Sequence, residues 1–275
     1  MYKVGLIGCG NMGEAMLSGA LKARWADPQS VILHTRRDER MVELSGRYPG
    51  IVTVKDNVSV AQGASLIVLA VKPNQYEKIL KEISTRISPG AVVLSLAPAF
   101  SLAKLRALIG REDVTVVRSM PNTPAMVGRG MTGVSFAEDT PEEHKERTIS
   151  FLNSFGEAVV VSESLMPAVG SVSGSSPAFI YMMIEALAQG AIRLGIGAED
   201  ALKFAAQSVE GAALMVKKTG RHPAVLRDEV CSAGGTTIAG VVSLERDGFN
   251  GSIVSAMEKT AERFSEMEKE ASQSG

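Results

Sequence analysis

Short apolar runs alternate with amphipathic stretches from the start of the chain to about residue 160. The apolar runs are rich in β-branched residues and have the length of buried strands. We predict a first strand from Lys3 and further strands at residues 31–35, 52–55, 65–71, 91–96, 114–118, 133–136 and 158–161. Helical periodicity covers residues 75–87, 102–109 and 141–155, the last with Thr140 as cap and Pro141 in its first position. This alternation predicts an α/β fold with a doubly wound parallel sheet.

The strand pattern ends near residue 162, and the patterns that follow are helical. They cover residues 177–194, 199–218, 223–230, 238–246 and 251–269. We therefore predict an α/β domain over residues 1–163 and an all-helical domain over residues 164–275. One helix is apolar on nearly every face, as a helix buried in a core or a subunit interface is. In a helical domain of this size we expect it to mediate dimerisation, through Phe179, Ile180, Met182, Met183, Ile184, Leu187 and Ile192.

The first strand runs into a glycine motif of the form G-x-G-x-x-G, followed by an amphipathic stretch. Gly8 allows a tight turn, Gly10 lets the backbone approach a pyrophosphate, and Gly13 permits close packing of helix on strand. Asn11 and Met12 begin the helix, whose unpaired N–H groups and positive dipole end attract phosphate. The alternative is a glycine-rich turn without a ligand. The apolar strand before the motif and the helix after it favour a dinucleotide-binding domain.

The end of the second strand indicates which dinucleotide is bound. An acidic residue at this position holds a ribose 2′-hydroxyl, but this chain has Thr35, Arg36 and Arg37 before its first carboxylate at Asp38. Two arginines and a hydroxyl suit a 2′-phosphate, which accepts charge-assisted hydrogen bonds. We therefore predict NADPH as cofactor in preference to NADH. The alternative, that these arginines are solvated turn charges, is stronger for Arg37 than for Arg36.

Composition narrows the class of protein further. The chain has 275 residues with 29 basic and 30 acidic side chains, a net charge of −1, and no basic stripe that would suggest nucleic acid. Its two cysteines, Cys9 and Cys231, indicate no disulfide framework and fit a reducing compartment. No leader or membrane-spanning run is evident, so we expect a soluble, cytoplasmic protein. The three histidines have no metal-ligand spacing, and we expect no metal site.

Ligands of open α/β sheets lie at the carboxyl ends of the strands, and three segments fall there. The loop after the fourth strand contains Ala70, Val71, Lys72 and Pro73, and Lys72 is either a phosphate or ribose contact or a solvated cation. Asn57, after the third strand, either binds the adenosine ribose or caps a helix. The stiff turn Pro121–Pro124 presents Asn122 and Thr123, whose amide and hydroxyl suit a nicotinamide carboxamide. For Thr123 a purely structural turn is equally plausible.

The most informative segment of the helical half is residues 228–240. One helix ends, Gly234 and Gly235 free the backbone, and a new helix begins on Thr236 and Thr237. The N–H groups of Gly235, Thr236 and Thr237 are the expected unpaired donors of that helix start, which suits a carboxylate or phosphate. Ser232 and Thr237 add hydroxyl groups. From spacing alone, an ordinary threonine-capped turn is an equal alternative.

With these motifs in place, the chain resembles the pyrroline-5-carboxylate reductases, which catalyse the last step of proline synthesis. The resemblance is carried by residues 4–13, 70–73, 120–124, 173–178 and, above all, 228–240. It implies a Rossmann domain, a helical domain that interlocks with its partner's, a substrate pocket at the dimer interface, and often rings of dimers. By match of position, the substrate carboxylate and ring nitrogen are bound by Ser232, Gly234, Gly235, Thr236 and Thr237. Ala233 stands where the family usually has proline, and Ser176 where it usually has glycine.

The chemistry of that reaction agrees with the residues. A cyclic imine needs a hydride donor, a clamp on its carboxylate and a partner for its nitrogen, and positioning two reactants is a large part of the rate. Thr237 is the candidate for the nitrogen. The nearest rival, a 3-hydroxyacid dehydrogenase, resembles the chain in architecture but carries a catalytic lysine where residues 176–185 contain none. A second rival, a non-catalytic NADPH sensor, has no need of the anion site at residues 232–237.

Overall fold

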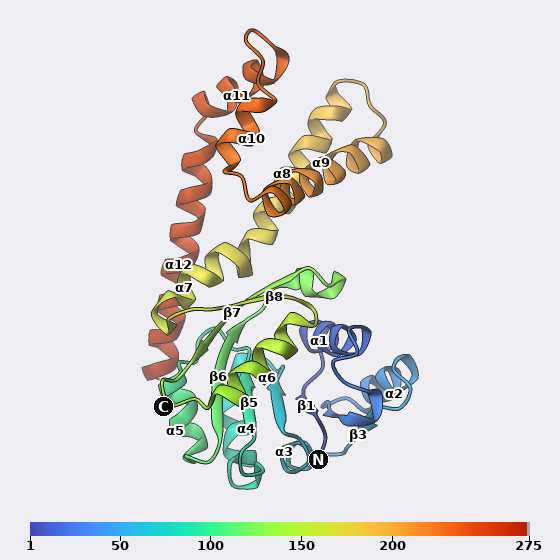
Figure 1. The fold of residues 1–275 in the computed structure, drawn as a ribbon, viewed down its shortest axis with the longest axis vertical. Coiled ribbons are helices and arrows are strands. Elements are labelled where there is room, and N and C mark those ends of the chain that lie inside the picture. Colours follow the sequence, from blue (N-terminus) through green and yellow to red (C-terminus); the bar gives the residue numbers. More distant parts are fainter. Residues whose placement is uncertain (274–275) are drawn as a thin grey trace. The chain divides into compact units, whose positions relative to one another are not determined.

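The computed structural model describes residues 1–273 and contains an eight-stranded sheet in the order β3-β2-β1-β4-β5-β6-β7-β8 (Figure 1). Every neighbouring pair is parallel except β6 and β7, which are antiparallel. The order reverses direction between β1 and β4, which makes the sheet doubly wound as predicted. The strands are β1 (Val4–Ile7), β2 (Val31–His34), β3 (Val52–Thr53), β4 (Leu66–Leu69), β5 (Val92–Ser95), β6 (Thr115–Met120), β7 (Gly130–Phe136) and β8 (Gly156–Val160).

Helices cover both faces of this sheet. Side chains alternate along each strand, so that Leu6 packs into one apolar cluster and Ile7 into the other. The first cluster contains residues of α1 (Asn11–Lys22), α2 (Asp38–Arg47) and α6 (Glu142–Asn153). The second contains residues of α3 (Asn57–Gly63), α4 (Tyr76–Ile83) and α5 (Leu102–Ile109). Both faces of the parallel strands are therefore buried, which explains why their sequences are apolar runs.

One helix start differs from its prediction. Helix α6 begins at Glu142 with Pro141 as N-cap, and no side chain caps it. Thr140 is buried, and its N–H donates to the carbonyl of Ala137 at 3.1 Å. The prediction that Thr140 caps this helix is therefore wrong, because Thr140 closes the preceding turn instead. Helix α5 matches its prediction, with Ser101 as cap and Gly110 in the left-handed region at its end.

Helices follow β8 in the sequence. They are α7 (Met166–Val169), a π-helical turn (Gly170–Ser175), α8 (Ser176–Arg193), α9 (Ala198–Thr219), α10 (Pro223–Glu229), α11 (Thr236–Arg246) and α12 (Phe249–Gln273). The chain forms two compact units, and the first comprises Met1–Ser175 together with residues 260–273. The second, called here the helical unit, is Ser176–Lys259. The division thus falls after Ser175 instead of after residue 163, and the last turns of α12 belong to the first unit.

Two sets of contacts attach the end of α12 to the first unit. Met267 and Ala271 pack against the second apolar cluster. The guanidinium of Arg118, on β6 and 1% exposed, forms ion pairs with Glu268 and, at 3.1 Å, with Glu163. It also donates to the carbonyl of Pro98 at 2.7 Å. A buried charge of this kind is tolerated because carboxylates compensate it.

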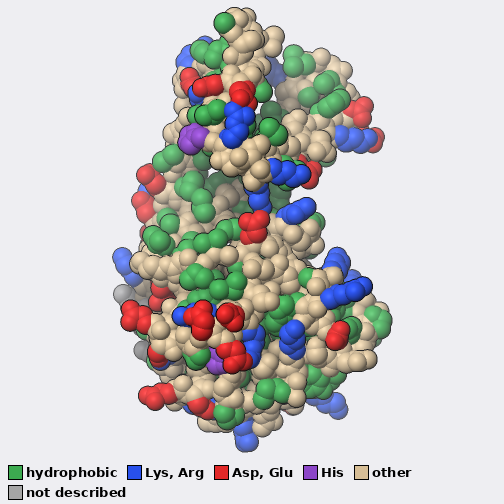
Figure 2. Space-filling view, in the orientation of Figure 1, with side chains coloured by type: hydrophobic (Ala, Val, Ile, Leu, Met, Phe, Trp, Pro, Cys, Tyr) green, Lys and Arg blue, Asp and Glu red, His purple; other side chains and the backbone are tan. Residues whose placement is uncertain are grey.

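The helical unit has a small core. Ala188, Ala201 and Ala205 are buried between α8 and α9, with Ile184 and Ala191 packed against them. Larger apolar side chains lie at the surface of the protomer, such as Met182 at 69% and Phe204 at 64% exposure, and Figure 2 shows apolar groups on this unit's surface. Exposed apolar side chains in this number mark an interaction surface. Among the described residues, no helix combines the length and apolarity needed to cross a membrane.

Candidate functional site

A cleft of about 390 Å³ opens at the carboxyl ends of β1, β2 and β4. Ligands of doubly wound sheets bind at this place, where the strand order reverses. Nine of the residues predicted to bind cofactor line it: Gly8, Gly10, Thr35, Arg36, Arg37, Asn57, Ala70, Val71 and Lys72. The structure therefore brings together segments that are up to 64 residues apart, counted from Gly8 to Lys72.

The glycines of the loop have the geometry that their pattern predicts. Gly8 has φ +79°, and a Cβ there would lie 2.5 Å from Val71 Cγ1. A Cβ on Gly13 would lie 3.0 Å from the Cβ of Ala70, so this glycine allows α1 to approach the strand. A Cβ on Gly10 would meet no atom within 4 Å, which leaves its surroundings open for a ligand. Gly10 is the N-cap of α1 and no side chain caps this helix, so the loop fits a pyrophosphate.

Six of the residues predicted to bind cofactor do not line this cleft: Asn11, Met12, Gly13, Pro73, Asn122 and Thr123. Asn11 and Met12 form the first turn of α1, and Pro73 begins a short 3₁₀ turn. Thr123 is exposed. Their contacts with a cofactor remain predictions.

Asn122 has a structural role that its sequence context did not indicate. Its side-chain amide donates to the carbonyl of Ser173 at 3.0 Å, and its carbonyl oxygen accepts from the N–H of Met131 at 2.8 Å. The side chain is 7% exposed. Asn122 thus joins the end of β6 to β7 and to the π-helical turn. Both polar ends of its side chain are used in these bonds, so the geometry gives no support to the predicted nicotinamide contact.

The turn after β2 presents two arginines to the cleft. Thr35 is buried, and its hydroxyl donates to the carbonyl of Arg37 at 3.0 Å, which holds the turn. Arg36 and Arg37 are exposed, and within the described residues neither guanidinium makes a hydrogen bond or an ion pair. Their charges are therefore available for a phosphate.

Asn57 lies in the cleft but does not cap a helix. Asp56 caps α3 by accepting from the N–H of Ser59 at 2.6 Å, so the alternative that Asn57 is the cap is wrong. The amide of Asn57 donates instead to Glu82 at 3.1 Å. Both residues line the cleft, and a ribose contact of Asn57 remains a prediction.

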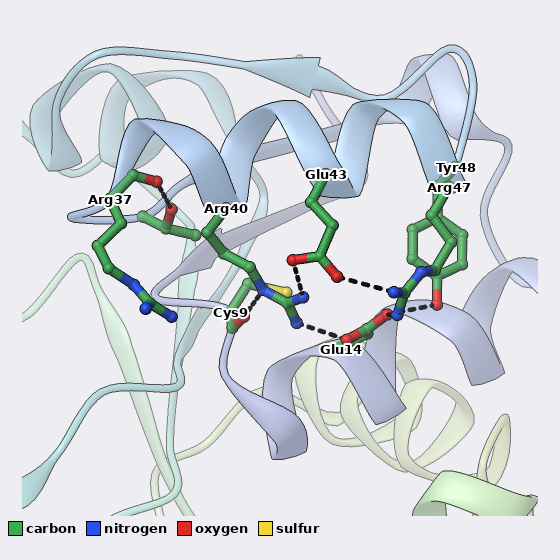
Figure 3. Close-up of polar contacts among 8 residues, drawn as sticks. Cys9, Glu14, Arg37, Arg40, Glu43, Arg47 and Tyr48 are labelled. Carbon is green, nitrogen blue, oxygen red and sulfur yellow. Dashed lines mark hydrogen bonds and ion pairs between the residues drawn. The ribbon is translucent and has the colours of Figure 1, made fainter.

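Sequence reasoning missed several residues of the cleft, namely Cys9, His34, Arg40, Gln75, Lys78, Ile79 and Glu82. Arg40 is the most connected of them (Figure 3). Its Nε donates to the carbonyl of Cys9 at 3.1 Å, and its other nitrogens pair with Glu14 and Glu43. The feature of the sequence that could have indicated Arg40 as a cleft residue is its position, one helical turn after Arg37. The buried Cys9 thiol is neutral because burial raises its pKa to about 12.

The second predicted site lies in the helical unit, where a tight turn precedes α11. The N–H of Gly235 donates to the carbonyl of Ser232 at 3.0 Å, and Gly234 has φ +67°. Turns with a left-handed third residue need glycine there and often have proline second, the position of Ala233. The structure forms this turn with Ala233, so the absence of the proline that the family usually has here does not prevent the turn. A Cβ on Gly235 would lie 2.3 Å from Ser232 Oγ, so a side chain at this position would displace the Ser232 hydroxyl.

This turn corrects one prediction. The N–H of Gly235 is not an unpaired donor, because it closes the turn on Ser232. Thr236 and Thr237 are the first two residues of α11, and such N–H groups have no partner within their helix. Ser232, Thr236 and Thr237 are exposed in the protomer. Their hydroxyl groups make no hydrogen bond within the described part of the chain.

Comparisons with known proteins match both parts of the chain. A family model described as pyrroline-5-carboxylate reductase dimerisation matches residues 163–267, and one described as NADP oxidoreductase coenzyme F420-dependent matches residues 3–99. The chain is 41% identical to pyrroline-5-carboxylate reductase of Escherichia coli, over 97% of this chain and 98% of that protein.

Solved structures give the same result. A pyrroline-5-carboxylate reductase from Coxiella burnetii superposes with a TM-score of 0.90 at 31% identity, over 97% of this chain and 98% of that one. The Plasmodium falciparum pyrroline carboxylate reductase, solved with NADP bound, has a TM-score of 0.86 at 26% identity, with the same coverage.

Proposed function

This chain belongs to the pyrroline-5-carboxylate reductase family, and we propose that it reduces 1-pyrroline-5-carboxylate to L-proline, the last step of proline biosynthesis. The reaction is an NADPH-dependent hydride transfer to the cyclic C=N bond. The observation that carries this proposal is the identity of 41% with the Escherichia coli reductase along nearly the whole of both chains. Both the cleft of the first unit and the glycine turn of the helical unit lie within the matched length.

We propose NADPH as the preferred cofactor, with NADH as a possible substitute. When bound, it supplies the hydride. The open side of Gly10 and the start of α1 hold the pyrophosphate, and Arg36 with Arg37 holds the 2′-phosphate. The loop from Ala70 to Pro73, Asn57 and Thr123 are the further candidates for contacts with the cofactor. For Asn122 the candidate contact is through its backbone, because its side chain is already used.

The turn before α11 is the proposed substrate site. The N–H groups of Thr236 and Thr237 bind the carboxylate at the helix start, and Ser232 adds its hydroxyl. Gly234 and Gly235 give this turn its shape. The hydroxyl of Thr237 bonds the imine nitrogen and is the candidate catalytic group. Residues 232–237 contain no acidic side chain, so the proposed contribution of this turn is to orient an imine that is protonated in water.

We further propose that the protein acts in the cytoplasm as a homodimer, with a ring of dimers as the larger assembly. The match of residues 163–267 to a dimerisation domain supports an oligomer. The exposed apolar side chains of the helical unit support the same conclusion, since dimerisation would bury them.

The decisive test measures NADPH oxidation by absorbance with and without pyrroline-5-carboxylate. We expect oxidation that depends on the substrate and formation of an equal amount of proline. Tight NADPH binding without oxidation would instead identify a nucleotide sensor. Oxidation of a 3-hydroxyacid by NADP in place of imine reduction would favour the rival dehydrogenase.

A further inference from the structure

Arg40 connects the two segments of the cleft that are proposed to bind phosphate. It lies in the first turn of α2, directly after the turn that carries Arg36 and Arg37. Its Nε donates to the carbonyl of Cys9, in the middle of the glycine loop, at 3.1 Å (Figure 3). One planar guanidinium therefore joins the helix that follows the arginine turn to the loop between Gly8 and Gly10.

The charge of Arg40 is already neutralised. One nitrogen pairs with Glu43 at 2.8 Å and another pairs with Glu14 on α1. Arg47 pairs with the same two carboxylates, and the hydroxyl of Tyr48 donates to Glu14 at 3.1 Å. Two arginines and two glutamates make this cluster neutral. Hydrogen bonds to Glu43 and Glu14 raise the pKa of Arg40, which keeps it charged and paired.

Arg36 and Arg37 differ from Arg40 in this respect. They make no ion pair within the described residues, whereas both Arg40 and Arg47 do. A cation that is compensated by two carboxylates attracts a phosphate less than an uncompensated one does. Arg40 is therefore suited to hold protein segments in place and poorly suited to bind the 2′-phosphate itself.

The glycine loop needs such a support. Gly8 and Gly10 have no side chains to fix the loop, and the residue between them is held by its buried side chain, 2% exposed, and by its carbonyl. The bond from Arg40 fixes that carbonyl from the side of α2. The loop and the arginine turn are thereby kept at one separation before any ligand arrives, and preorganisation of this kind raises affinity.

We propose that Arg40 is a positioning residue for cofactor recognition, which sets the distance between the pyrophosphate loop and the 2′-phosphate turn. The proposal rests on the proposed use of NADPH. It predicts that the loss of Arg40 weakens the binding of ligands that contact both segments. The binding of ligands that contact the arginine turn alone should change little.

The test measures binding by calorimetry for Arg40→Gln and the parent, using NADPH as the spanning ligand and adenosine 2′-monophosphate as the ligand of the turn. We expect the dissociation constant for NADPH to rise ~10-fold, because the glycine loop loses its preorganised position, and that for adenosine 2′-monophosphate to change by less than ~3-fold. An equal rise for both ligands would show direct contact with the 2′-phosphate and would overturn the proposal. An unchanged constant for NADPH would overturn it as well.

Two further variants separate positioning from charge. Arg47→Gln breaks ion pairs with the same carboxylates but no bond to the loop, and we expect it to bind NADPH like the parent. The double variant Glu14→Gln/Arg40→Gln removes the carboxylate of residue 14 together with the guanidinium that pairs with it. We expect its binding of NADPH to stay as weak as that of Arg40→Gln. Recovery of binding in the double variant would show that repulsion by Glu14 caused the loss, and the proposal would then fail.

Arg40→Lys keeps the charge and is the variant to use if Arg40→Gln does not fold. An ammonium group cannot keep all three bonds in one plane, so we expect NADPH binding to weaken by ~3-fold or more, again without an equal change for adenosine 2′-monophosphate. Parent-like NADPH binding by Arg40→Lys would contradict the proposal. Failure of the parent to turn over pyrroline-5-carboxylate would refute the proposed reaction and leave these binding results intact.

Discussion

Arg36 is the residue on which the choice of cofactor depends. It lines the cleft, and within the described residues its guanidinium has no ion pair. Arg36→Ala should remove charge-assisted hydrogen bonds worth ~1.5–3 kcal/mol from NADPH, a rise of roughly 10- to 100-fold in its dissociation constant. The constant for NADH should barely change, because NADH has no 2′-phosphate.

Fluorescence titration with both cofactors checks this prediction. Arg86→Ala, an exposed arginine that does not line the cleft, is the matched control and should bind both like the parent. Equal losses for NADPH and NADH in Arg36→Ala would mean that the arginine supports the cleft in general.

Thr237 and Ser232 should have different kinetic effects. Thr237→Ala keeps the backbone N–H, so carboxylate binding should persist while kcat falls ~10²-fold or more, the usual loss when a preorganised donor to developing charge is deleted. Ser232→Ala should mainly raise KM, as removal of uniform binding does. Steady-state kinetics at saturating NADPH distinguishes the two. A parent-like kcat for Thr237→Ala would leave the imine nitrogen to water or the cofactor.

At the scale of single residues, the sequence was informative where the role of a residue depends on its neighbours in the sequence. The glycine loop and the Arg36 turn were predicted because their pattern is local. Arg40 was missed because its partners, Cys9 and Glu14, lie 31 and 26 residues away. The structural role of Asn122 was missed for the same reason, since its amide bonds the carbonyl of Ser173, 51 residues later.

Among the secondary-structure elements, β4 and β5 are joined at their carboxyl ends by one buried side chain. Tyr76, at the start of α4, donates to the carbonyl of Leu69 at 2.6 Å and accepts from the N–H of Leu96 at 2.9 Å. Its ring stacks on Phe100 with a centroid distance of 5.1 Å. Burial raises the pKa of Tyr76 to about 12, so the hydroxyl remains a donor.

Tyr76→Phe should lower the free energy of unfolding by about 1–3 kcal/mol, because one buried and one partly buried backbone group lose their partner. Urea unfolding at one fixed protein concentration measures the change. Tyr48→Phe is the control, since the hydroxyl of Tyr48 is only partly buried, and it should cost less than about 1 kcal/mol. A smaller loss for Tyr76→Phe than for Tyr48→Phe would contradict this account of the strand ends.

The elements were predicted well where periodicity is regular, as in α5, whose observed bounds are those predicted. The division into compact units differs from the predicted domain boundary because that division depends on packing. The last turns of α12 join the first unit because Met267 and Ala271 contact its core and Glu268 pairs with Arg118. None of these contacts leaves a periodicity that differs from the rest of the helix.

At the scale of the whole molecule, the exposed apolar side chains of the helical unit predict that the protein is an oligomer of this chain. Ile184 was expected at the subunit interface, but it packs against the small core between α8 and α9. Met182, on the same helix and 69% exposed, is therefore the better probe. In an isolated protomer Met182→Glu places a charge in water, which costs little. In a dimer that buries this side chain, the charge should disrupt assembly.

Light scattering after size exclusion should show a monomer or aggregate for Met182→Glu, with activity lost. Gln62→Glu, which adds a charge to an exposed position of the first unit, should leave the mass unchanged. A fully active dimer of parental mass for Met182→Glu would place the interface elsewhere on the helical unit.

The pairing of Arg118 with both Glu163 and Glu268 has a consequence for anyone who dissects this protein. The helical unit is an insertion: the nucleotide-binding unit precedes it and resumes after it in the same helix. A single stop codon after Ser175 would therefore remove Glu268 and uncover apolar surface at the same time. A fragment that rejoins residue 175 to residue 260 through a flexible linker retains both carboxylates, and it is the smaller protein with which the cleft can be studied alone.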